Sequence, residues 1–251
     1  MGRIQMDRVS SAELSAIQEL VTHGAVQIPL RITHLVPGAI RGFNAFLEKP
    51  YEYRRGWDLW IEDERRRDVQ DIGYKDKGAE PGEDAKHIFH WTVQLERLLI
   101  EERGVDINDH ADFLGYARSI FTICYREFRY IAEALDYVMP EGRFLERASD
   151  PAAKRQSILR FVRYKDVNRD VIGKGHTDKN LISLHLADSH PGLRLEKHGQ
   201  LYATSPDVAL VFPGDKMDVI TNGRIKALYH YVTDQRKPGD KTLRWVMVFF
   251  G

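Results

Sequence analysis

The sequence predicts an α+β fold of one domain, residues 1–251, with a helix-rich part at 1–150 and a β-rich part at 151–251. Before residue 150, apolar residues recur at helical spacing. After about residue 155, short segments rich in branched and aromatic residues alternate with Gly, Pro, Asn and Asp turns. That texture is typical of an antiparallel sandwich or barrel. Apolar residues make up 43% of the chain, enough to bury a core.

Three helices are predicted in the first part. Residues 10–23 open with serines and a glutamate in capping-box order and continue with apolar residues at helical spacing. Residues 36–50 carry a proline near the start and another at the end, as helices often do. The strongest pattern is the long apolar stripe of 112–139. A short strand is expected at 24–32, and the charged, glycine-containing stretch 51–86 is expected to be mostly solvated loop.

The β-rich part divides into short candidate strands. The segments are SILRFVRYKDV (157–167), LISLHLAD (181–188), LRLEKHGQLYAT (193–204), VALVFPGD (208–215), MDVIT (217–221), IKALYHYVTD (225–234) and TLRWVMVFF (242–250). Between two of them, NGR at 222–224 suggests a type I′ hairpin turn.

Charge and cysteine usage narrow the class of protein. Lys plus Arg and Asp plus Glu both number 37, and this balance argues against a dedicated nucleic-acid binder. No apolar stretch is long enough to span a membrane. The single cysteine, Cys124, cannot form an internal disulfide, and no signal-peptide pattern opens the chain. We therefore expect a cytoplasmic protein in which Cys124 is a buried structural residue.

A candidate metal site begins with His176 and Asp178, which flank one threonine. In an extended strand, positions i and i+2 share a face, although such a pair is weak support alone. His230, in a later apolar strand, supplies a third ligand. Two histidines and one carboxylate form the facial triad of non-haem Fe(II) oxygenases. Zinc is the competing metal, and the β-rich setting favours iron.

With these three residues placed, the sequence resembles the iron- and 2-oxoglutarate-dependent oxygenases of the isopenicillin N synthase-like group. The resemblance is co-linear over almost the whole chain. It rests on AVQIPL (25–30), DIGY (71–74), GEDAKHIFHW (82–91), ILRFVRY (158–164), GHTDKNLISLHLAD with PGLRL (175–195) and PDVALVFPGDKMDVITNGRIKALYHYV (206–232).

This resemblance implies a double-stranded β-helix, or jelly roll, in which His176, Asp178 and His230 bind Fe(II). It also implies 2-oxoglutarate and O2 as cosubstrates, with succinate and CO2 formed as a small molecule is hydroxylated, desaturated or cyclised. The aspartate in the triad argues against a halogenase, because halogenases vacate that position for chloride.

The resemblance further implies an Arg-x-Ser pair that holds the far carboxylate of 2-oxoglutarate. Arg244 stands at the arginine position, while Val246 replaces the serine. A lost hydroxyl bond costs about 0.5–1.5 kcal/mol, so Arg244 alone can still bind the cosubstrate. The alternative is a surface arginine on an edge strand. The stretch 233–241 is interpreted as a lengthened hairpin turn, and Tyr164 either contacts the cosubstrate or packs in the core.

Four residues are expected to line the substrate pocket: His87 and Trp91 in KHIFHW, with Val162 and Arg163 beside Tyr164. His90, in the same KHIFHW segment, is a further candidate. At the last two positions, Val162 replaces an asparagine and Arg163 a tyrosine of the family pattern.

Several other polar residues are expected to be structural. His185 is expected to be a hydrogen-bonded barrel residue rather than a cavity residue. His190 and His198 are expected to be exposed near turns, and EDERRR at 62–67 to form a solvated face.

Alternatives remain open at this point. A relative that keeps the iron but uses no 2-oxoglutarate is the main one, because Val246 weakens the cosubstrate site. A catalytically silent binding protein is another, and the balanced charge disfavours a nucleic-acid demethylase. We expect a compact polar small-molecule substrate, no nucleic-acid or membrane partner, and a chain that can act as a monomer.

Overall fold

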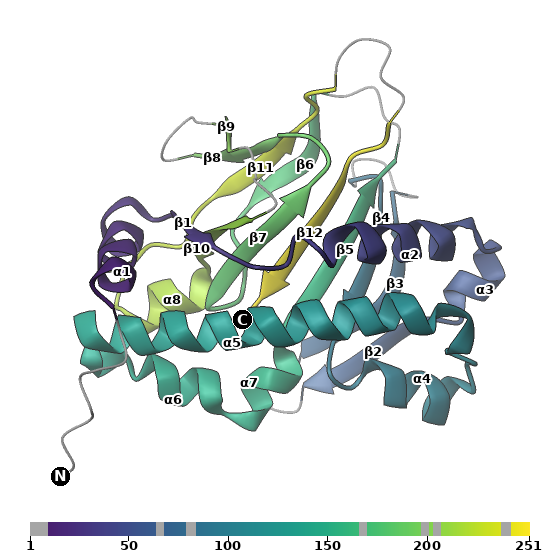
Figure 1. Cartoon of the computed structure of the whole chain (residues 1–251), viewed down its shortest axis with the longest axis horizontal. Helices are drawn as coiled ribbons and strands as arrows, with labels where there is room; N and C mark the ends of the chain where they lie inside the picture. Colours follow the sequence, from purple (N-terminus) through teal and green to yellow (C-terminus); the bar gives the residue numbers. More distant parts are fainter. Residues whose placement is uncertain are drawn as a thin grey trace.

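Two antiparallel sheets face each other in the computed structural model, which describes residues 10–63, 68–78, 84–165, 170–196, 201–202, 207–236 and 242–251. The larger sheet has the strand order β1-β10-β7-β12-β5-β4-β3-β2 and the smaller one β6-β11-β8-β9 (Figure 1). The strands are β1 (Val26–Pro29), β2 (Asp58–Asp63), β3 (Asp68–Lys77), β4 (Lys86–Trp91), β5 (Ile158–Tyr164), β6 (Val171–His176), β7 (Ile182–Asp188), β8 (Leu193–Leu195), β9 (Leu201–Tyr202), β10 (Val208–Pro213), β11 (His230–Thr233) and β12 (Trp245–Phe250).

The strands from β5 onward make a jelly roll. Along the chain, β5, β7, β10 and β12 enter the larger sheet, while β6, β8, β9 and β11 enter the smaller one. Each turn of the chain therefore adds one strand to each sheet, which is the double-stranded β-helix that the resemblance implied. The predicted α+β class and jelly-roll core are confirmed.

Alternate residues of the central strands face two different environments. On β5, Val162 and Tyr164 point between the sheets, into an apolar cluster shared with the smaller sheet. Leu159 and Phe161 point to the other face, into the main core. Because side chains alternate along a strand, residue parity decides which face a residue serves.

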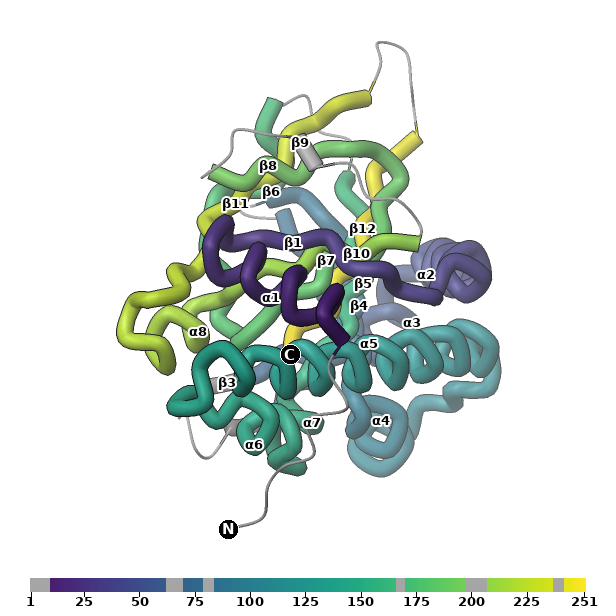
Figure 2. The backbone as a smooth tube through the Cα atoms, turned by 60° about the vertical axis from the view of Figure 1, so that its left-hand side comes forward, coloured from purple at the N-terminus to yellow at the C-terminus, as the bar shows by residue number. Residues whose placement is uncertain are grey.

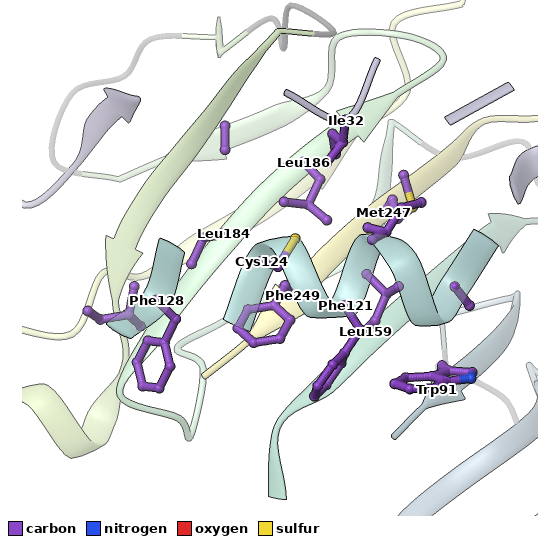
Figure 3. Close-up of a cluster of buried hydrophobic side chains, with 14 of the residues drawn as sticks. Ile32, Trp91, Phe121, Cys124, Phe128, Leu159, Leu184, Leu186, Met247 and Phe249 are labelled. Atoms are coloured by element: carbon purple, nitrogen blue, oxygen red, sulfur yellow. The ribbon is translucent and has the colours of Figure 1, made fainter. Parts of the chain in front are cut away.

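Helices cover the outer face of the larger sheet, on the side away from the smaller sheet (Figures 1 and 2). The helices in the described residues are α1 (Ser11–His23), α2 (Val36–Glu48), α3 (Tyr51–Arg55), α4 (Leu95–Arg103), η1 (Asn108–His110), α5 (Ala111–Val138), η2 (Pro140–Gly142), α6 (Phe144–Ser149), α7 (Pro151–Gln156) and α8 (Asp215–Ile220). The long α5 lays Phe121, Cys124 and Phe128 against β7 and β12 (Figure 3). No helix in the described ranges is long and apolar enough to cross a membrane.

The three predicted helices and the strand at 24–32 are all present. Ser10 caps α1 with a complete capping box, accepting from the Glu13 amide while the Glu13 carboxylate accepts from the Ser10 amide. Cys124 is free and fully buried, as predicted, and burial raises the pKa of its thiol.

Two predicted segments are corrected. The stretch 51–86 contains α3 and the strands β2 and β3 rather than mostly loop, because Leu59, Ile72 and Tyr74 are buried at alternating positions on the face that the helices cover. The charged residues on the other face hid the alternating apolar pattern of these strands in the sequence. The segment 217–221 lies largely in α8 rather than in a strand, because the chain turns after Gly214 and starts a short helix at Asp215.

The turn predicted at 222–224 is present, with Asn222 and Gly223 both at positive φ. It follows α8 instead of joining two strands. Glu62 and Asp63 of the predicted solvated face lie in β2, and 64–67 lie outside the described residues.

Candidate active site

Three candidate ligands converge at one end of the jelly roll. His176 is the last residue of β6 and His230 the first of β11, and the two are directly paired in the smaller sheet. Asp178 follows β6 in the next loop. His176 Nε2 lies 3.5 Å from Asp178 Oδ1, and His230 Nε2 lies 3.9 Å from the same oxygen. One ligand atom from each residue lies within 4.8 Å of the other two, a spacing that a single divalent ion can bridge.

Backbone carbonyls hold both imidazoles in the orientation a metal requires. His176 Nδ1 donates to the Lys174 carbonyl at 2.8 Å, and His230 Nδ1 donates to the Leu228 carbonyl at 3.0 Å. The protonated Nδ1 leaves each Nε2 lone pair free toward the shared point, as in ligating histidines generally. The ring of Phe212 packs edge-on against His230, with centroids 5.0 Å apart.

The carboxylate of Asp178 is buried and prepared to ligate. Its Oδ2 accepts a hydrogen bond from Ser183 Oγ at 2.5 Å, so Oδ1 is the oxygen turned to the histidines. Burial opposes ionisation, yet the hydrogen bonds from His176 and Ser183 and the charge of His230 hold the pKa of Asp178 below its ordinary value. Burial lowers the pKa of His230. A charged oxygen and a neutral imidazole are the donor forms a divalent cation needs.

Arg244 lies deep between the sheets, 1% exposed, just before β12. Its Nη2 donates to Asp188 Oδ2 at 2.7 Å, and its Nε donates to the His190 carbonyl at 3.1 Å. Its Nη1 is buried and has no hydrogen-bond partner among the described residues. An orphaned guanidinium nitrogen inside a protein is costly, so this nitrogen is suited to an anionic ligand.

The alternative placement of Arg244 on an edge strand is wrong. β12 lies between β5 and β7 in the larger sheet. The lengthened hairpin expected at 233–241 is also corrected, because β11 and β12 belong to different sheets and their link crosses between them. Residues 237–241 of that link lie outside the described part of the chain.

Tyr164 and Val246 lie on the same inward face as Arg244. The Arg244 guanidinium carbon is 5.5 Å from the centroid of the Tyr164 ring, and Tyr164 is 6% exposed. Val246 of β12 is similarly buried and pairs with Val162 of the neighbouring strand β5. Its methyl groups offer no hydrogen bond where the family pattern has a serine.

The residues expected to line the substrate pocket divide by strand parity. Trp91 packs on Phe121 of α5, with ring centroids 4.9 Å apart, and belongs to the main core. His87 hydrogen-bonds Tyr74 through Nδ1 at 2.9 Å, and Arg163 hydrogen-bonds Asn44 of α2 at 3.2 Å.

These three residues therefore lie on the helix-covered face of the sheet. Val162 faces inward, within the apolar cluster between the sheets.

A cavity of about 770 Å³ adjoins the triad. His90 and Arg160 line it, rather than the expected His87, Trp91 and Arg163. It also touches His176 and Asp178. His90 was a candidate from its segment, whereas Arg160 was not singled out. The signal that would have found Arg160 is its parity: it lies four residues before Tyr164, on the same face of β5.

The remaining histidines fill structural places. His185 is buried and bonded to Asp188 at 3.2 Å, as predicted. His190 is half-buried rather than exposed, because its carbonyl accepts from the buried Arg244. His198 lies outside the described residues.

Comparisons with known proteins agree with this geometry. Residues 155–251 match the family model of the 2OG-Fe(II) oxygenase superfamily. The chain is 29% identical over 174 residues to gibberellin 2-beta-dioxygenase 2 of Arabidopsis thaliana, covering 65% of this chain and 45% of that protein. It is 29% identical over 160 residues to a 2-oxoglutarate-dependent dioxygenase of Didymella fabae, covering 58% of this chain and 46% of that protein. The chain thus spans about half the length of these curated relatives.

Solved structures share the fold. A full-length Neurospora crassa protein in complex with alpha-KG superimposes with a TM-score of 0.72 at 20% identity, covering 95% of this chain and 78% of that one. The Arabidopsis thaliana dioxygenase for auxin oxidation 1, in its complex with 2-oxoglutarate, gives 0.68 at 15% identity, covering 98% and 90%. The β-rich part of the chain, residues 155–251, thus matches the 2OG-Fe(II) oxygenase superfamily, and the jelly roll described above carries that match.

Proposed function

We propose that this protein is an Fe(II)- and 2-oxoglutarate-dependent oxygenase that hydroxylates, desaturates or cyclises a small molecule. The observation that carries the proposal is the meeting of three ligand atoms within 4.8 Å at a cavity of about 770 Å³. The named relatives, among them gibberellin 2-beta-dioxygenases, support the reaction class. The whole chain is proposed to be one oxygenase domain, because strands from both halves enter the larger sheet.

His176, Asp178 and His230 would hold the iron through Nε2, Oδ1 and Nε2. Two imidazoles and one carboxylate suit Fe(II) and leave positions on the metal for other ligands. When bound, Fe(II) supplies the activation of O2 that couples decarboxylation of 2-oxoglutarate, giving succinate and CO2, to oxidation of the substrate. Zinc fits the same donor atoms, but the family match favours iron.

Arg244 would hold the far carboxylate of 2-oxoglutarate. Its unpartnered Nη1 is the donor that remains after Asp188 and the His190 carbonyl have taken Nη2 and Nε. Those two bonds orient the planar guanidinium, so little side-chain entropy is lost when the cosubstrate binds. Tyr164 would contribute its phenol from the adjoining strand, and Val246 would contribute only apolar contact.

A second candidate is an iron-dependent oxidase that works without 2-oxoglutarate. Two observations favour it: Val246 removes a hydroxyl from the site, and the ion pair with Asp188 already balances the charge of Arg244. Both candidates use the same triad, and the fate of 2-oxoglutarate separates them.

The test measures 2-oxoglutarate binding by calorimetry, with Mn(II) in place of Fe(II) to prevent turnover. Arg244→Gln should weaken 2-oxoglutarate at least about tenfold, because a charge-assisted bond is worth about 1.5–3 kcal/mol. The metal affinity should not change, which also reports that the variant is folded. The matched control is Arg163→Gln, which removes the same charge from the outer face of β5.

Stoichiometric succinate in the Fe(II) enzyme completes the test. If Arg244→Gln binds 2-oxoglutarate as tightly as the parent chain, Arg244 does not hold the cosubstrate. If the Fe(II) protein consumes O2 with substrate but forms no succinate, the second candidate holds instead.

A cytoplasmic setting and a small-molecule partner are proposed on two observations. The single cysteine is a free, buried thiol, which suits a reducing compartment. The net charge of zero favours a small molecule over a nucleic acid.

A further inference from the structure

Arg160 is a charged residue of the cavity that has no role in the proposed iron and cosubstrate sites. It lies at the middle of β5, on the inward face, and lines the cavity beside the triad. Its Nε donates to His90 Nε2 at 2.8 Å. No residue in the described part of the chain forms an ion pair with it, although it is half-buried. A half-buried cation without an anion is unusual, because desolvation of the charge is uncompensated.

His90 holds Arg160 without neutralising it. The Nδ1 of His90 donates to the Asp71 carbonyl at 2.8 Å, so Nε2 carries the lone pair that accepts from Arg160. Burial and then the charge of Arg160 keep the pKa of His90 well below its ordinary value, so the imidazole stays neutral. The two-step chain from Asp71 to Arg160 fixes the Nε side of the guanidinium and leaves its two Nη groups for another partner.

Phe250 fixes the plane of the same guanidinium. The Arg160 guanidinium carbon lies 4.4 Å from the centroid of the Phe250 ring, a cation–π contact. Phe250 and Phe128 both line the cavity. One wall therefore offers a flat cation and aromatic carbon side by side.

The acidic groups of the cavity are engaged elsewhere. The Asp71 carboxylate pairs with Lys75 at 3.2 Å, and the Asp150 carboxylate accepts from the Ala152 amide at 2.7 Å as the cap of α7. Asp178 belongs to the triad. Burial lowers the pKa of Arg160, and the negative charge of Asp178 opposes that shift. The two side chains form no ion pair.

The other cations of the cavity add to the positive side. Lys179 and Lys216 line it together with Arg147. The Nε of Arg147 donates to the Gly142 carbonyl. Because that carbonyl is neutral, the bond does not offset the positive charge of Arg147. The cavity therefore presents more positive than negative charge to a ligand, once Asp178 is committed to a metal.

From this arrangement we infer that the substrate carries a carboxylate, which Arg160 binds through its Nη groups while Phe250 and Phe128 contact the apolar body. This inference rests on the proposed function, since it assigns the substrate class of the same site. A planar guanidinium matches a carboxylate in a two-point geometry that an ammonium group cannot provide. The position of Arg160 near Asp178 would place the bound anion within reach of the metal.

The experiment compares carboxylates with their primary amides, which have nearly the same shape but no charge. The probes are phenylacetate with phenylacetamide and cyclohexanecarboxylate with cyclohexanecarboxamide. Binding is measured by calorimetry on the full chain, with Mn(II) and saturating 2-oxoglutarate so that the triad and Arg244 are occupied. Paramagnetic relaxation of the probe protons by Mn(II) then reports their distance from the metal.

The expected result is at least a tenfold preference for a carboxylate over its amide, with strong relaxation of its protons. Arg160→Gln should remove that preference. Arg163→Gln, three residues along the same strand but on the outer face, should change the carboxylate affinity by less than about twofold. Arg160→Lys keeps the charge without the fork and should lose most of the preference, which distinguishes two-point binding from bulk charge.

Equal affinity of acid and amide for the parent chain overturns the inference, as does an unchanged preference in Arg160→Gln. Failure of the proposed function looks different: Mn(II) and 2-oxoglutarate then do not bind. In that case the affinities of acid and amide for the metal-free chain, with and without Arg160, still decide whether Arg160 selects an anion.

Discussion

The two faces of strand β5 serve opposite purposes within seven residues. On the outer face, Phe161 is fully buried against Phe43 and Phe113, with ring centroids 5.7 and 5.2 Å away. On the inner face, Arg160 lines the cavity beside the triad, and Tyr164 packs against the Arg244 guanidinium. The outer face is filled to exclude water, and the inner face keeps charged groups partly unpaired. One strand can do both because neighbouring side chains point in opposite directions.

This contrast teaches that stability and chemistry can be altered separately. Changes on the outer face should alter the free energy of unfolding and leave ligand affinities of the folded protein intact. Changes on the inner face should do the reverse.

The largest expected effect is on the metal. His176→Ala removes one of three ligands, and we expect Fe(II) binding, measured by anaerobic titration, to be lost together with all turnover. His176 has 48% of its side chain exposed, so the fold should survive, with the same unfolding midpoint as the metal-free parent. The control is His87→Ala, a histidine on the outer face of β4. Full Fe(II) affinity in His176→Ala would remove this residue from the metal site.

The next effect is on stability. Phe161→Ala deletes a fully buried ring and should lower the free energy of unfolding by about 3–5 kcal/mol, measured by denaturant titration. The Mn(II) affinity of the remaining folded protein should match that of the parent chain. A weakened metal site would show that the two faces are coupled through the strand.

Much of this architecture was predictable from local patterns. The helical stripe of 112–139 and the capping box at Ser10 correspond to α5 and α1 almost residue for residue, because these signals depend only on neighbours in the chain. The strands β2 and β3 were missed because an edge hairpin with one charged face has the composition of a loop.

The site was predictable only in part. The triad could be anticipated because His230 in a later apolar strand and the co-linear family resemblance add to the His176 and Asp178 pair. The cavity residues could not, because their identification needs the parity of β4 and β5 relative to the sheet faces. A shift of one residue in the assumed register replaces His90 by Trp91 and Arg160 by Phe161, and both of these replacements lie on the outer face. The ion pair between Arg244 and Asp188 joins residues 56 apart in the chain, and no local pattern announces it.

The smallest expected effect concerns Val246, where the inner face departs from the family pattern. Val246→Ser should restore a hydroxyl beside Arg244 and tighten 2-oxoglutarate about two- to tenfold, since one hydrogen bond contributes about 0.5–1.5 kcal/mol. Val246→Ala is the control, because it removes the same apolar volume and adds no hydroxyl. Calorimetry with Mn(II) measures both. Asp188 already orients Arg244 from the neighbouring strand. If the serine variant binds 2-oxoglutarate no better than the alanine variant, Asp188 takes the place of the hydroxyl, and the valine at this position costs the site nothing.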